Sequence, residues 1–209
     1  SPLSNWNGLL FDGPRDVRAD LASLGGHDFD FGSHVLDRVE IHECNYNWKT
    51  FIEVYLEDYH VGPFHPGLGK FVTCEDLKWE FAPWASLQTV GINATLARAG
   101  TKTYERWHKA VLDYYRGEQP PHGAIWLTYY PNIMVEWYPH VLAISTLYPR
   151  AVDRTLNVVE FYYPEDIALF EPEFIKAEQA AYMETAIEDD DIGGRIDRGR
   201  HALLKQGRS

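Results

Sequence analysis

Cysteine is scarce in this sequence, because Cys44 and Cys74 are the only two among its 209 residues. Two thiols cannot form the disulfide framework of a small secreted domain, so we expect ordinary buried thiols and a cytoplasmic protein. No apolar run approaches the roughly 20 residues that a helix needs to span a bilayer. The chain opens with Ser1 and Pro2, with neither a Met nor a basic and then apolar signal sequence. We therefore expect no membrane partner, and a chain that is part of a longer polypeptide.

Basic residues are also outnumbered, with 19 Lys and Arg against 31 Asp and Glu, which gives a formal net charge of −12. Nucleic-acid binding depends on a Lys- and Arg-rich surface that displaces counterions from phosphates, so this balance argues against a nucleic-acid partner. It argues equally against an anionic membrane surface. The sequence also lacks G-x-S-x-G, P-loop and G-x-G-x-x-G motifs, which leaves hydrolase, NTPase and dinucleotide-binding functions without support.

Aromatic residues, in contrast, are abundant: the chain has 7 Trp, 13 Tyr and 10 Phe. Such rigid apolar side chains can form the walls of a pocket for a small organic ligand, or can simply fill a large core. No repeat, low-complexity stretch or long linker divides the chain. Its length and its 45% hydrophobic content suit a single globular domain over residues 1–209.

The pattern of apolar residues predicts an α+β fold, in which a run of strands is followed by helices. Closely spaced strands joined by short turns favour an antiparallel meander. These elements predict a large antiparallel sheet with helices packed on one face and a long C-terminal helix. The expected helices are 14–24 (closed by Gly25 and Gly26), 48–59, 104–115 and 165 almost to the C-terminus; the expected strands are 34–46, one or two within 71–93, 124–130, 133–138, 141–147 and 154–163.

The segment that follows Asn47, a residue that can cap a helix, carries the most informative pattern. Apolar residues recur there at helical spacing, and a second, polar line that includes Glu57 and His60 runs along the same expected helix. Such a line is usually a solvated face. If the helix ends near His60, however, the chain can turn and direct the imidazoles of His60 and His65 to one point. Two imidazoles and a carboxylate form the facial triad suited to Fe(II), but the H-x4-H spacing alone is a weak indication.

A recognisable signature is formed by Asn47-Trp48-Lys49, Glu57-Asp58-Tyr59-His60 and His65-Pro66. It resembles the iron site of Rieske non-haem iron ring-hydroxylating oxygenases, in the C-terminal catalytic domain of their large (alpha) subunit. Both histidines are iron ligands in that family, which implies the same role for His60 and His65. Glu57 resembles the family's bridging carboxylate, which links the iron to the Rieske cluster of a neighbouring subunit through a cluster-ligand histidine.

The resemblance extends over nearly the whole chain. The segment 6–11 is similar to the one that leads out of the Rieske domain, and residues 124–126 with 131–132 resemble central strands that contribute to the substrate pocket. The pair Glu188-Asp189, followed by Arg198-Gly199, resembles the closing helix that supplies the third iron ligand. Helical phase alone leaves Asp189, Asp190 and Asp191 open, and a solvated acidic patch is the plainer interpretation. The family spacing selects Asp189, with Asp190 as the fallback.

The sequence departs from the family pattern in two respects. Glu53 stands where the family usually has Asn, four residues before the bridging acid, which puts the polar surroundings of the iron in doubt. No C-x-H and C-x-x-H pair occurs, and two cysteines cannot supply the two-Cys, two-His ligand set of a Rieske 2Fe–2S cluster. The resemblance therefore implies a cluster on an N-terminal portion absent from this sequence or on another chain.

The resemblance implies a helix-grip (START/Bet v1-like) oxygenase domain that uses dioxygen and a mononuclear Fe(II). Its expected role is mono- or dioxygenation, or oxidative demethylation, of a small aromatic or hydrophobic compound in aromatic hydrocarbon catabolism. Glu57 would couple the iron to the cluster and orient His60. The family further implies a homotrimer and a reductase, sometimes with a ferredoxin, that delivers electrons from NAD(P)H. The expected substrate-pocket residues are Tyr59, Phe64, Trp126, Asn132 and Met134.

Two alternatives come from other functional classes. A helix-grip binding protein would hold a hydrophobic ligand without redox chemistry, since architecture does not fix function. A zinc hydrolase would use the same ligand types without reductant or dioxygen. The other histidines lack metal-like neighbours in the sequence, so we expect surface or core roles for His27, His34, His42, His108, His122, His140 and His201.

Overall fold

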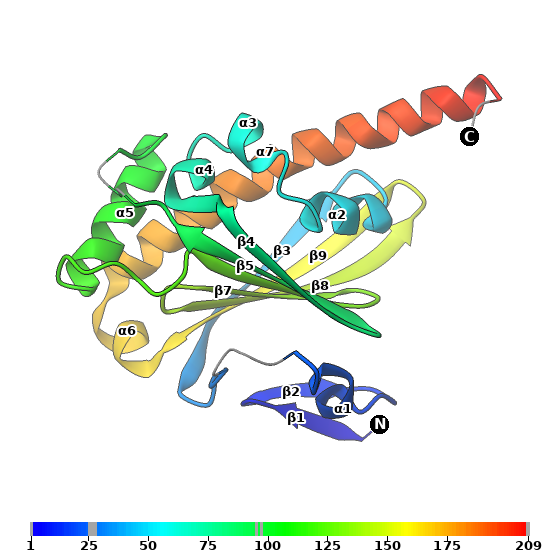
Figure 1. The fold of residues 1–209 in the computed structure, drawn as a ribbon. Helices are drawn as coiled ribbons and strands as arrows, with labels where there is room; N and C mark the ends of the chain where they lie inside the picture. The colour runs from blue at the N-terminus through cyan, green and yellow to red at the C-terminus, as the bar shows by residue number, and fades with distance from the viewer. Residues whose placement is uncertain (1, 25–28, 95, 97, 208–209) are drawn as a thin grey trace.

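A seven-stranded antiparallel sheet forms the centre of the computed structural model, which describes residues 2–24, 29–94, 96 and 98–207. Helices cover one face of this sheet, and a small N-terminal unit lies against the other (Figure 1). The longest helix, α7 (Pro172–Lys205), runs diagonally over the sheet and extends past it. The predicted α+β class, with helices on one face and a long C-terminal helix, is confirmed.

The sheet is a meander of six consecutive strands to which one earlier strand is added. Its strand order is β3-β9-β8-β7-β6-β5-β4, and every neighbouring pair is antiparallel. The predicted stretch 71–93 forms two strands around a turn at Pro83-Trp84. The strands are β3 (His34–Cys44), β4 (Val72–Ala82), β5 (Ala85–Ile92), β6 (Ala124–Tyr129), β7 (Ile133–Tyr138), β8 (Val141–Ala151) and β9 (Arg154–Pro164).

The helices depart from the predictions mainly in their lengths. The predicted helix over 14–24 is α1 (Val17–Leu21), and its expected end at Gly25 and Gly26 lies outside the described residues. The predicted helix over 48–59 is wrong in its last turn, because α2 (Trp48–Tyr55) ends at Leu56, whose φ and ψ angles of −84° and 3° leave the helical range. The other helices are α3 (Val61–Phe64), α4 (Leu68–Phe71), α5 (Lys102–Tyr114) and α6 (Glu165–Phe170).

The N-terminal unit contains a hairpin that was not predicted. Its strands β1 (Leu3–Trp6) and β2 (Leu9–Asp12) pair through a turn at Asn7 and Gly8, both of which have positive φ angles, 51° and 100°. Asn-Gly is the sequence that favours such a turn, so the signal was present. A Cβ on Gly8 would also meet the backbone of Gly32 at 2.7 Å. Glycine is therefore required there both by conformation and by space.

Two hydrophobic cores lie on the two faces of the sheet. The core on the helix side includes Phe71, Trp107 and Phe161, whereas the core on the other face includes Trp6 and Leu127. The helix-side core holds most of the large aromatic residues close to the pocket described below. Both sequence-based interpretations of the aromatic content therefore apply, because these residues fill the cores and also line a pocket.

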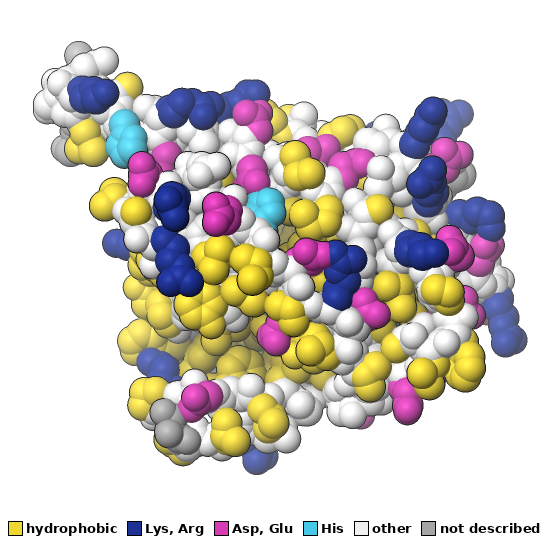
Figure 2. Space-filling model, turned by 180° about the vertical axis from the view of Figure 1, so that it is seen from behind, with side chains coloured by type: hydrophobic (Ala, Val, Ile, Leu, Met, Phe, Trp, Pro, Cys, Tyr) yellow, Lys and Arg dark blue, Asp and Glu magenta, His cyan; other side chains and the backbone are white. Residues whose placement is uncertain are grey.

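The surface facing away from the view of Figure 1 is hydrophobic in part. Figure 2 shows hydrophobic side chains gathered around a hollow between the main body and the N-terminal unit. The edge strand β3 also exposes Val35, Leu36, Val39 and Ile41 by between 38% and 66%. No helix in the described part of the chain is long and apolar enough to cross a membrane. Of the two thiols, Cys44 is fully buried and Cys74 is half-buried.

Candidate metal centre

His60 and His65 flank a single helical turn, α3. His60 precedes the first residue of α3 and His65 follows its last; the Phe64 N–H donates to the His60 carbonyl at 2.8 Å. This turn brings the two imidazole rings to 4.9 Å, centroid to centroid. The His65 side chain is 1% exposed and that of His60 is 11% exposed. The chain therefore turns after α2 and directs both rings into the interior, which is the condition that the sequence analysis set for a shared metal site.

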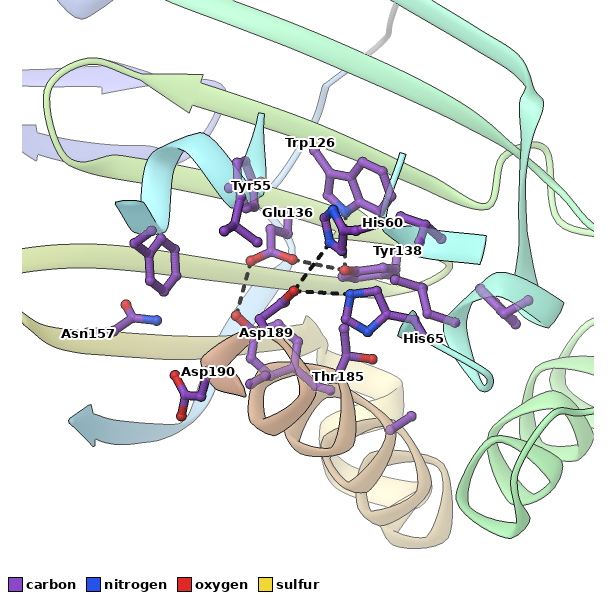
Figure 3. A pocket seen from close by; sticks show the side chains of 18 of the residues that line it. Tyr55, His60, His65, Trp126, Glu136, Tyr138, Asn157, Thr185, Asp189 and Asp190 are labelled. Atoms are coloured by element: carbon purple, nitrogen blue, oxygen red, sulfur yellow. Dashed lines mark hydrogen bonds and ion pairs between the residues drawn. The ribbon is translucent and has the colours of Figure 1, made fainter. Parts of the chain in front are cut away.

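Helix α7 supplies the third donor. Oδ1 of Asp189 lies 3.3 Å from Nε2 of His60 and 3.0 Å from Nε2 of His65. Figure 3 shows the three side chains pointing toward one another from α7 and the α3 turn. Their donor atoms lie within 4.8 Å of one another, and the buried Oδ1 of Asp189 has no hydrogen-bond partner. Two imidazole nitrogens and an unpartnered carboxylate oxygen that converge in this way fit a divalent metal such as Fe(II).

The other nitrogen of each imidazole contacts a second carboxylate. Oε1 of Glu57 contacts Nδ1 of His60, while its Oε2 accepts the His60 backbone N–H at 3.2 Å. Oε2 of Glu188 lies 2.7 Å from Nδ1 of His65. A carboxylate beside Nδ1 holds the imidazole proton on that atom. Nε2, which faces Asp189, is then unprotonated and its lone pair can bind a metal ion. Sequence reasoning assigned this role to Glu57 but missed it for Glu188.

The electrostatics of the cluster favour a cation. Burial lowers the pKa of His60 and of His65, but the neighbouring carboxylates, Asp189 first among them, raise each pKa above its usual value. Burial raises the pKa of Asp189, but the two imidazoles lower it further, so the pKa lies below its usual value. Because Glu57, Glu188 and Asp189 surround two imidazoles, a bound metal cation would meet an excess of negative charge.

A test of the outer carboxylate follows from this geometry. We expect Glu188→Gln to weaken iron binding by roughly 10-fold, because outer partners of metal-bound histidines typically contribute 10- to 100-fold to affinity. The affinity is measured by competition with a chelator. Glu184→Gln serves as the control, since Glu184 lies one turn earlier on α7 and accepts a hydrogen bond from Thr101 instead of a histidine. Equal iron affinity in the wild type and in Glu188→Gln would contradict the assigned role.

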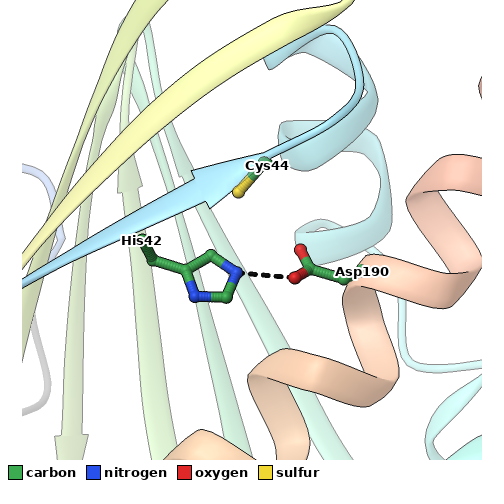
Figure 4. Close-up of side chains that lie close together, drawn as sticks. All are labelled: His42, Cys44 and Asp190. Carbon is green, nitrogen blue, oxygen red and sulfur yellow. Dashed lines mark hydrogen bonds and ion pairs between the residues drawn. The ribbon is translucent and has the colours of Figure 1, made fainter.

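Asp190, the fallback ligand, belongs to a different cluster. Its Oδ2 lies 2.6 Å from Nε2 of His42, and its Oδ1 accepts the Tyr46 hydroxyl at 3.0 Å. The Asp190 hydrogen bond raises the pKa of His42 to about 10. Figure 4 shows His42 and Cys44 on β3 facing Asp190 on α7. These neighbours of His42 could not be predicted from sequence, because β3 and α7 meet only in the folded chain.

The group formed by His42, Cys44 and Asp190 also has donor atoms within 4.8 Å of one another. No other histidine in the described ranges joins such a group, and His27 lies outside those ranges. The expectation that His42 lacks metal-like neighbours is therefore wrong. Its ring is nevertheless satisfied by the hydrogen bond to Asp190, which accounts for the cluster without a metal.

Hydrogen bonds and an ion pair connect the α2 region to α7 beside the candidate metal centre. The Asp197 carboxylate accepts the backbone N–H of Asn47 at 2.7 Å and contacts the Thr50 hydroxyl. Glu53 pairs with Arg200 of α7. Glu53, which stands where the family usually has Asn, is therefore a charged residue that is paired with α7. It does not contact the two histidines.

Gly193 allows α7 to approach Tyr46 closely, four residues after Asp189. A Cβ at this position would meet the Tyr46 ring at 2.8 Å. The ring and the glycine therefore fix how closely α7 lies to the segment between β3 and α2.

A pocket adjoins the three donors between the helices and the sheet. Of the five expected wall residues, Trp126 lines this pocket and the other four do not. Tyr59 and Phe64 lie on the outer side of the α3 turn and are 87% and 45% exposed. Met134 packs with Ile52 and Leu147 beneath α2. The fourth, Asn132, lies in the β6–β7 turn, where its amide donates to the Leu147 carbonyl at 2.9 Å.

The observed pocket walls are aromatic and acidic, and they come from α2, α5, α7 and the central strands. Besides the histidines and Asp189, these walls contain Phe51, Tyr55, Glu57, Tyr104, Trp107, Trp126, Glu136, Tyr138, Asn157, Glu178, Tyr182 and Asp190. The acids are the unexpected part of this set. Sequence reasoning predicted a hydrophobic pocket and named no carboxylate in it apart from those of the iron site.

The sequence matches the family described as "Ring hydroxylating alpha subunit (catalytic domain)" over residues 30–208. The chain belongs to this family. The predicted identity, a Rieske oxygenase alpha-subunit catalytic domain, is thereby confirmed. The fold agrees with a solved structure of a quaternary ammonium Rieske monooxygenase, with a TM-score of 0.61 at 16% identity. That match covers 80% of this chain and 41% of that one.

Two curated relatives of this Rieske oxygenase domain are named putrescine 2-hydroxylase. The one from Ralstonia nicotianae is 66% identical over 210 residues, covering 100% of this chain and 58% of the relative. The one from Bordetella bronchiseptica is 62% identical over 206 residues, covering 98% of this chain and 48% of the relative. The chain thus spans about half the length of these relatives. The names of these relatives contradict the expected link to aromatic hydrocarbon catabolism, since putrescine, the compound that they name, is an aliphatic diamine.

Proposed function

We propose that this chain is the catalytic domain of an oxygenase that hydroxylates a small aliphatic amine of the putrescine class. In this proposal His60, His65 and Asp189 hold a mononuclear Fe(II). The observation that carries the proposal is the convergence of their three donor atoms within 4.8 Å beside a pocket with acidic walls. The two relatives named putrescine 2-hydroxylase, at 66% and 62% identity, support the substrate class.

The protein's own residues prepare the site for the metal. The carboxylates of Glu57 and Glu188 hold a proton on Nδ1 of each histidine, so that both Nε2 atoms can donate to the iron. A ferrous ion bound there would supply the dioxygen chemistry. With three protein donors, an ion held there would still be able to bind further ligands. The aromatic walls of the adjoining pocket would limit the access of water.

Glu57 is proposed to have a further task, the electronic coupling of the iron to a Rieske 2Fe–2S cluster. Its side chain is 33% exposed, whereas the His60 side chain that it contacts is 11% exposed. It therefore connects the buried centre to the surface, where a partner can approach. The cluster would lie on an N-terminal portion or on another chain of a homotrimer. A reductase, with or without a ferredoxin, would supply the electrons from NAD(P)H.

The function is tested by turnover of the full-length, iron-loaded protein with a reducing system and putrescine. We expect a product that carries one additional oxygen atom, and with isotopically labelled dioxygen we expect the label in that product. Mass spectrometry measures both. If iron is bound but neither putrescine nor a related diamine is oxygenated, the proposed substrate class is wrong.

A further inference from the structure

Glu136 is a buried carboxylate in the pocket wall that the metal centre does not use. It lies on β7 directly between Trp126 of β6 and Ala143 of β8, and it is 6% exposed. Figure 3 labels it among the residues that line the pocket together with His60, His65 and Asp189. The position on the helix-facing side of the central strand points the carboxylate toward the space that adjoins the metal ligands.

Neutral donors hold the carboxylate in place. Oε2 of Glu136 accepts the Tyr138 hydroxyl at 2.9 Å, and Oε1 accepts the Tyr182 hydroxyl at 3.0 Å. The Tyr138 oxygen in turn accepts the Trp126 indole N–H at 3.1 Å. These bonds fix the orientation of Glu136, but tyrosine hydroxyls carry no charge that could balance a carboxylate.

Three of the other pocket acids have a basic partner. Glu57 and Asp189 contact the iron-site histidines, and Asp190 contacts His42. Glu178 resembles Glu136, because it is 3% exposed and accepts a hydrogen bond from the Tyr163 hydroxyl at 2.6 Å. In the part of the chain that the structure describes, neither Glu136 nor Glu178 forms an ion pair with any Lys, Arg or His. Glu136 is therefore one of two pocket acids that lack a paired counter-charge.

The unfavourable free energy of this buried carboxylate indicates the charge of the ligand that the pocket binds. A buried carboxylate without a counter-charge is unfavourable, and proteins normally neutralise such a group or pair it with a cation. The pKa of Glu136 is raised to about 7, chiefly by burial. Asp189 contributes to this rise, whereas the hydrogen bonds from Tyr138 and Tyr182 oppose it. A cationic ligand in the pocket would supply the missing charge and would keep the carboxylate ionised.

The surroundings of Glu136 also suit an ammonium group. The rings of Tyr55, Tyr138 and Tyr182 line the same pocket, and aromatic faces attract ammonium ions. The Tyr55 hydroxyl and Oδ1 of Asn157 are buried without a hydrogen-bond partner. Each oxygen can accept an N–H of an alkylammonium ion, which has three N–H donors to satisfy.

We propose that Glu136 binds an ammonium group of the substrate and thereby selects aliphatic amines over neutral molecules of the same shape. This inference rests on the proposed function and names the residue that recognises its substrate class. Because Glu136 lines the same pocket as His60, His65 and Asp189, a short amine held by Glu136 would lie close to the metal ligands. Glu136 would then be a specificity-determining residue that takes no part in binding the iron.

The test is equilibrium binding of putrescine and of neutral 1,4-butanediol to the full-length, iron-loaded protein, measured by calorimetry. We expect Glu136→Gln to weaken putrescine binding about 100-fold, since loss of one partner of a buried charge pair has effects of this size. Binding of 1,4-butanediol should be unchanged or tighter. Glu136→Asp keeps the charge and should recover much of the putrescine affinity. Glu173→Gln is the charge control, because the Glu173 side chain is 84% exposed at the start of α7.

The outcomes separate this inference from the function on which it rests. If the wild type binds putrescine and Glu136→Gln binds it equally well, the role of Glu136 is refuted and the proposed function stands. If the wild type itself binds neither putrescine nor a related diamine, the role of Glu136 and the proposed function are both refuted. The measurement on the wild type is sufficient to show this. Iron content and thermal stability accompany each variant. Equal loss of affinity for putrescine and 1,4-butanediol, with a lowered Tm, would make Glu136 structural and would also refute the inference.

Discussion

Replacement of Asp189 by alanine is expected to remove the iron and with it the oxygenation activity. Asp189 is the carboxylate whose Oδ1 lies 3.0–3.3 Å from both imidazole Nε2 atoms, and this oxygen has no other partner. Its loss would leave two neutral nitrogen donors without a charged ligand. We expect iron affinity to fall by more than the roughly 100-fold that loss of an outer partner can cause. Iron per chain, measured by mass spectrometry of the purified protein, tests this.

The adjacent residue provides the matched control. Asp190→Ala removes the same group from the next position of α7, but Asp190 contacts His42 and Tyr46 instead of the iron-site histidines. This variant should keep its iron, although the loss of two hydrogen bonds should lower its Tm. The opposite pattern, with iron lost in Asp190→Ala and kept in Asp189→Ala, would make the fallback residue the ligand.

Glu57→Gln is expected to give the second large effect, on the rate of oxygenation. The amide can still accept a hydrogen bond from His60, so the histidine should keep its orientation. Iron affinity should fall by no more than the roughly 10-fold expected for Glu188→Gln, so that the variant can still be loaded with iron. The charge that is proposed to couple the iron to a cluster is lost. We expect the single-turnover rate of the reduced, full-length protein to fall about 10- to 100-fold. Rapid quenching followed by product analysis measures this rate.

Glu53→Gln controls for the loss of an acid near the same helix. Glu53 lies four residues earlier and pairs with Arg200 on α7, with no contact to His60. Its single-turnover rate should match that of the wild type. A Glu57→Gln variant that retains iron and turns over at the wild-type rate would exclude the coupling role of Glu57.

His60 and His65 could be proposed as a pair from the sequence because they lie in one short motif, whereas Asp189 was selected over Asp190 and Asp191 only by the family spacing. His60 and His65 are five residues apart, and their convergence required only that the chain turn between them. The turn itself has a local cause, since Oε2 of Glu57 accepts the His60 backbone N–H once α2 has ended. Periodicity alone extends the helix to Tyr59 because the apolar spacing continues after the backbone has left the helix.

Residues that meet only through tertiary packing could not be predicted in this way. Glu188 reaches His65 across 123 positions of the chain, and His42 reaches Asp190 across 148. The register that places Glu136 between Trp126 and Ala143 also becomes visible only when the strands are paired. Tyr59 was assigned to the pocket from its nearness in sequence, but its position on α3's outer side carries it into solvent.

The overall fold was easier to predict from the sequence, because the same local pattern, a strand followed by a turn, recurs along the chain. Strands β6 to β9 are joined by short turns, and Pro131 and Pro139 mark two of the boundaries. Antiparallel pairing of neighbours then follows from chain connectivity. The Asn7-Gly8 hairpin was missed although its turn signal was present, because each of its strands has only four residues.

The central claim is that His60, His65 and Asp189 share one iron ion. Crystals of the iron-loaded protein, measured on both sides of the iron absorption edge, test it most directly. We predict a single strong anomalous peak at about 2.0–2.3 Å from both Nε2 atoms and from Oδ1 of Asp189, the range typical of protein nitrogen and oxygen donors. An iron-loaded crystal with no peak at this point, or with its peak between His42 and Asp190, would contradict the account.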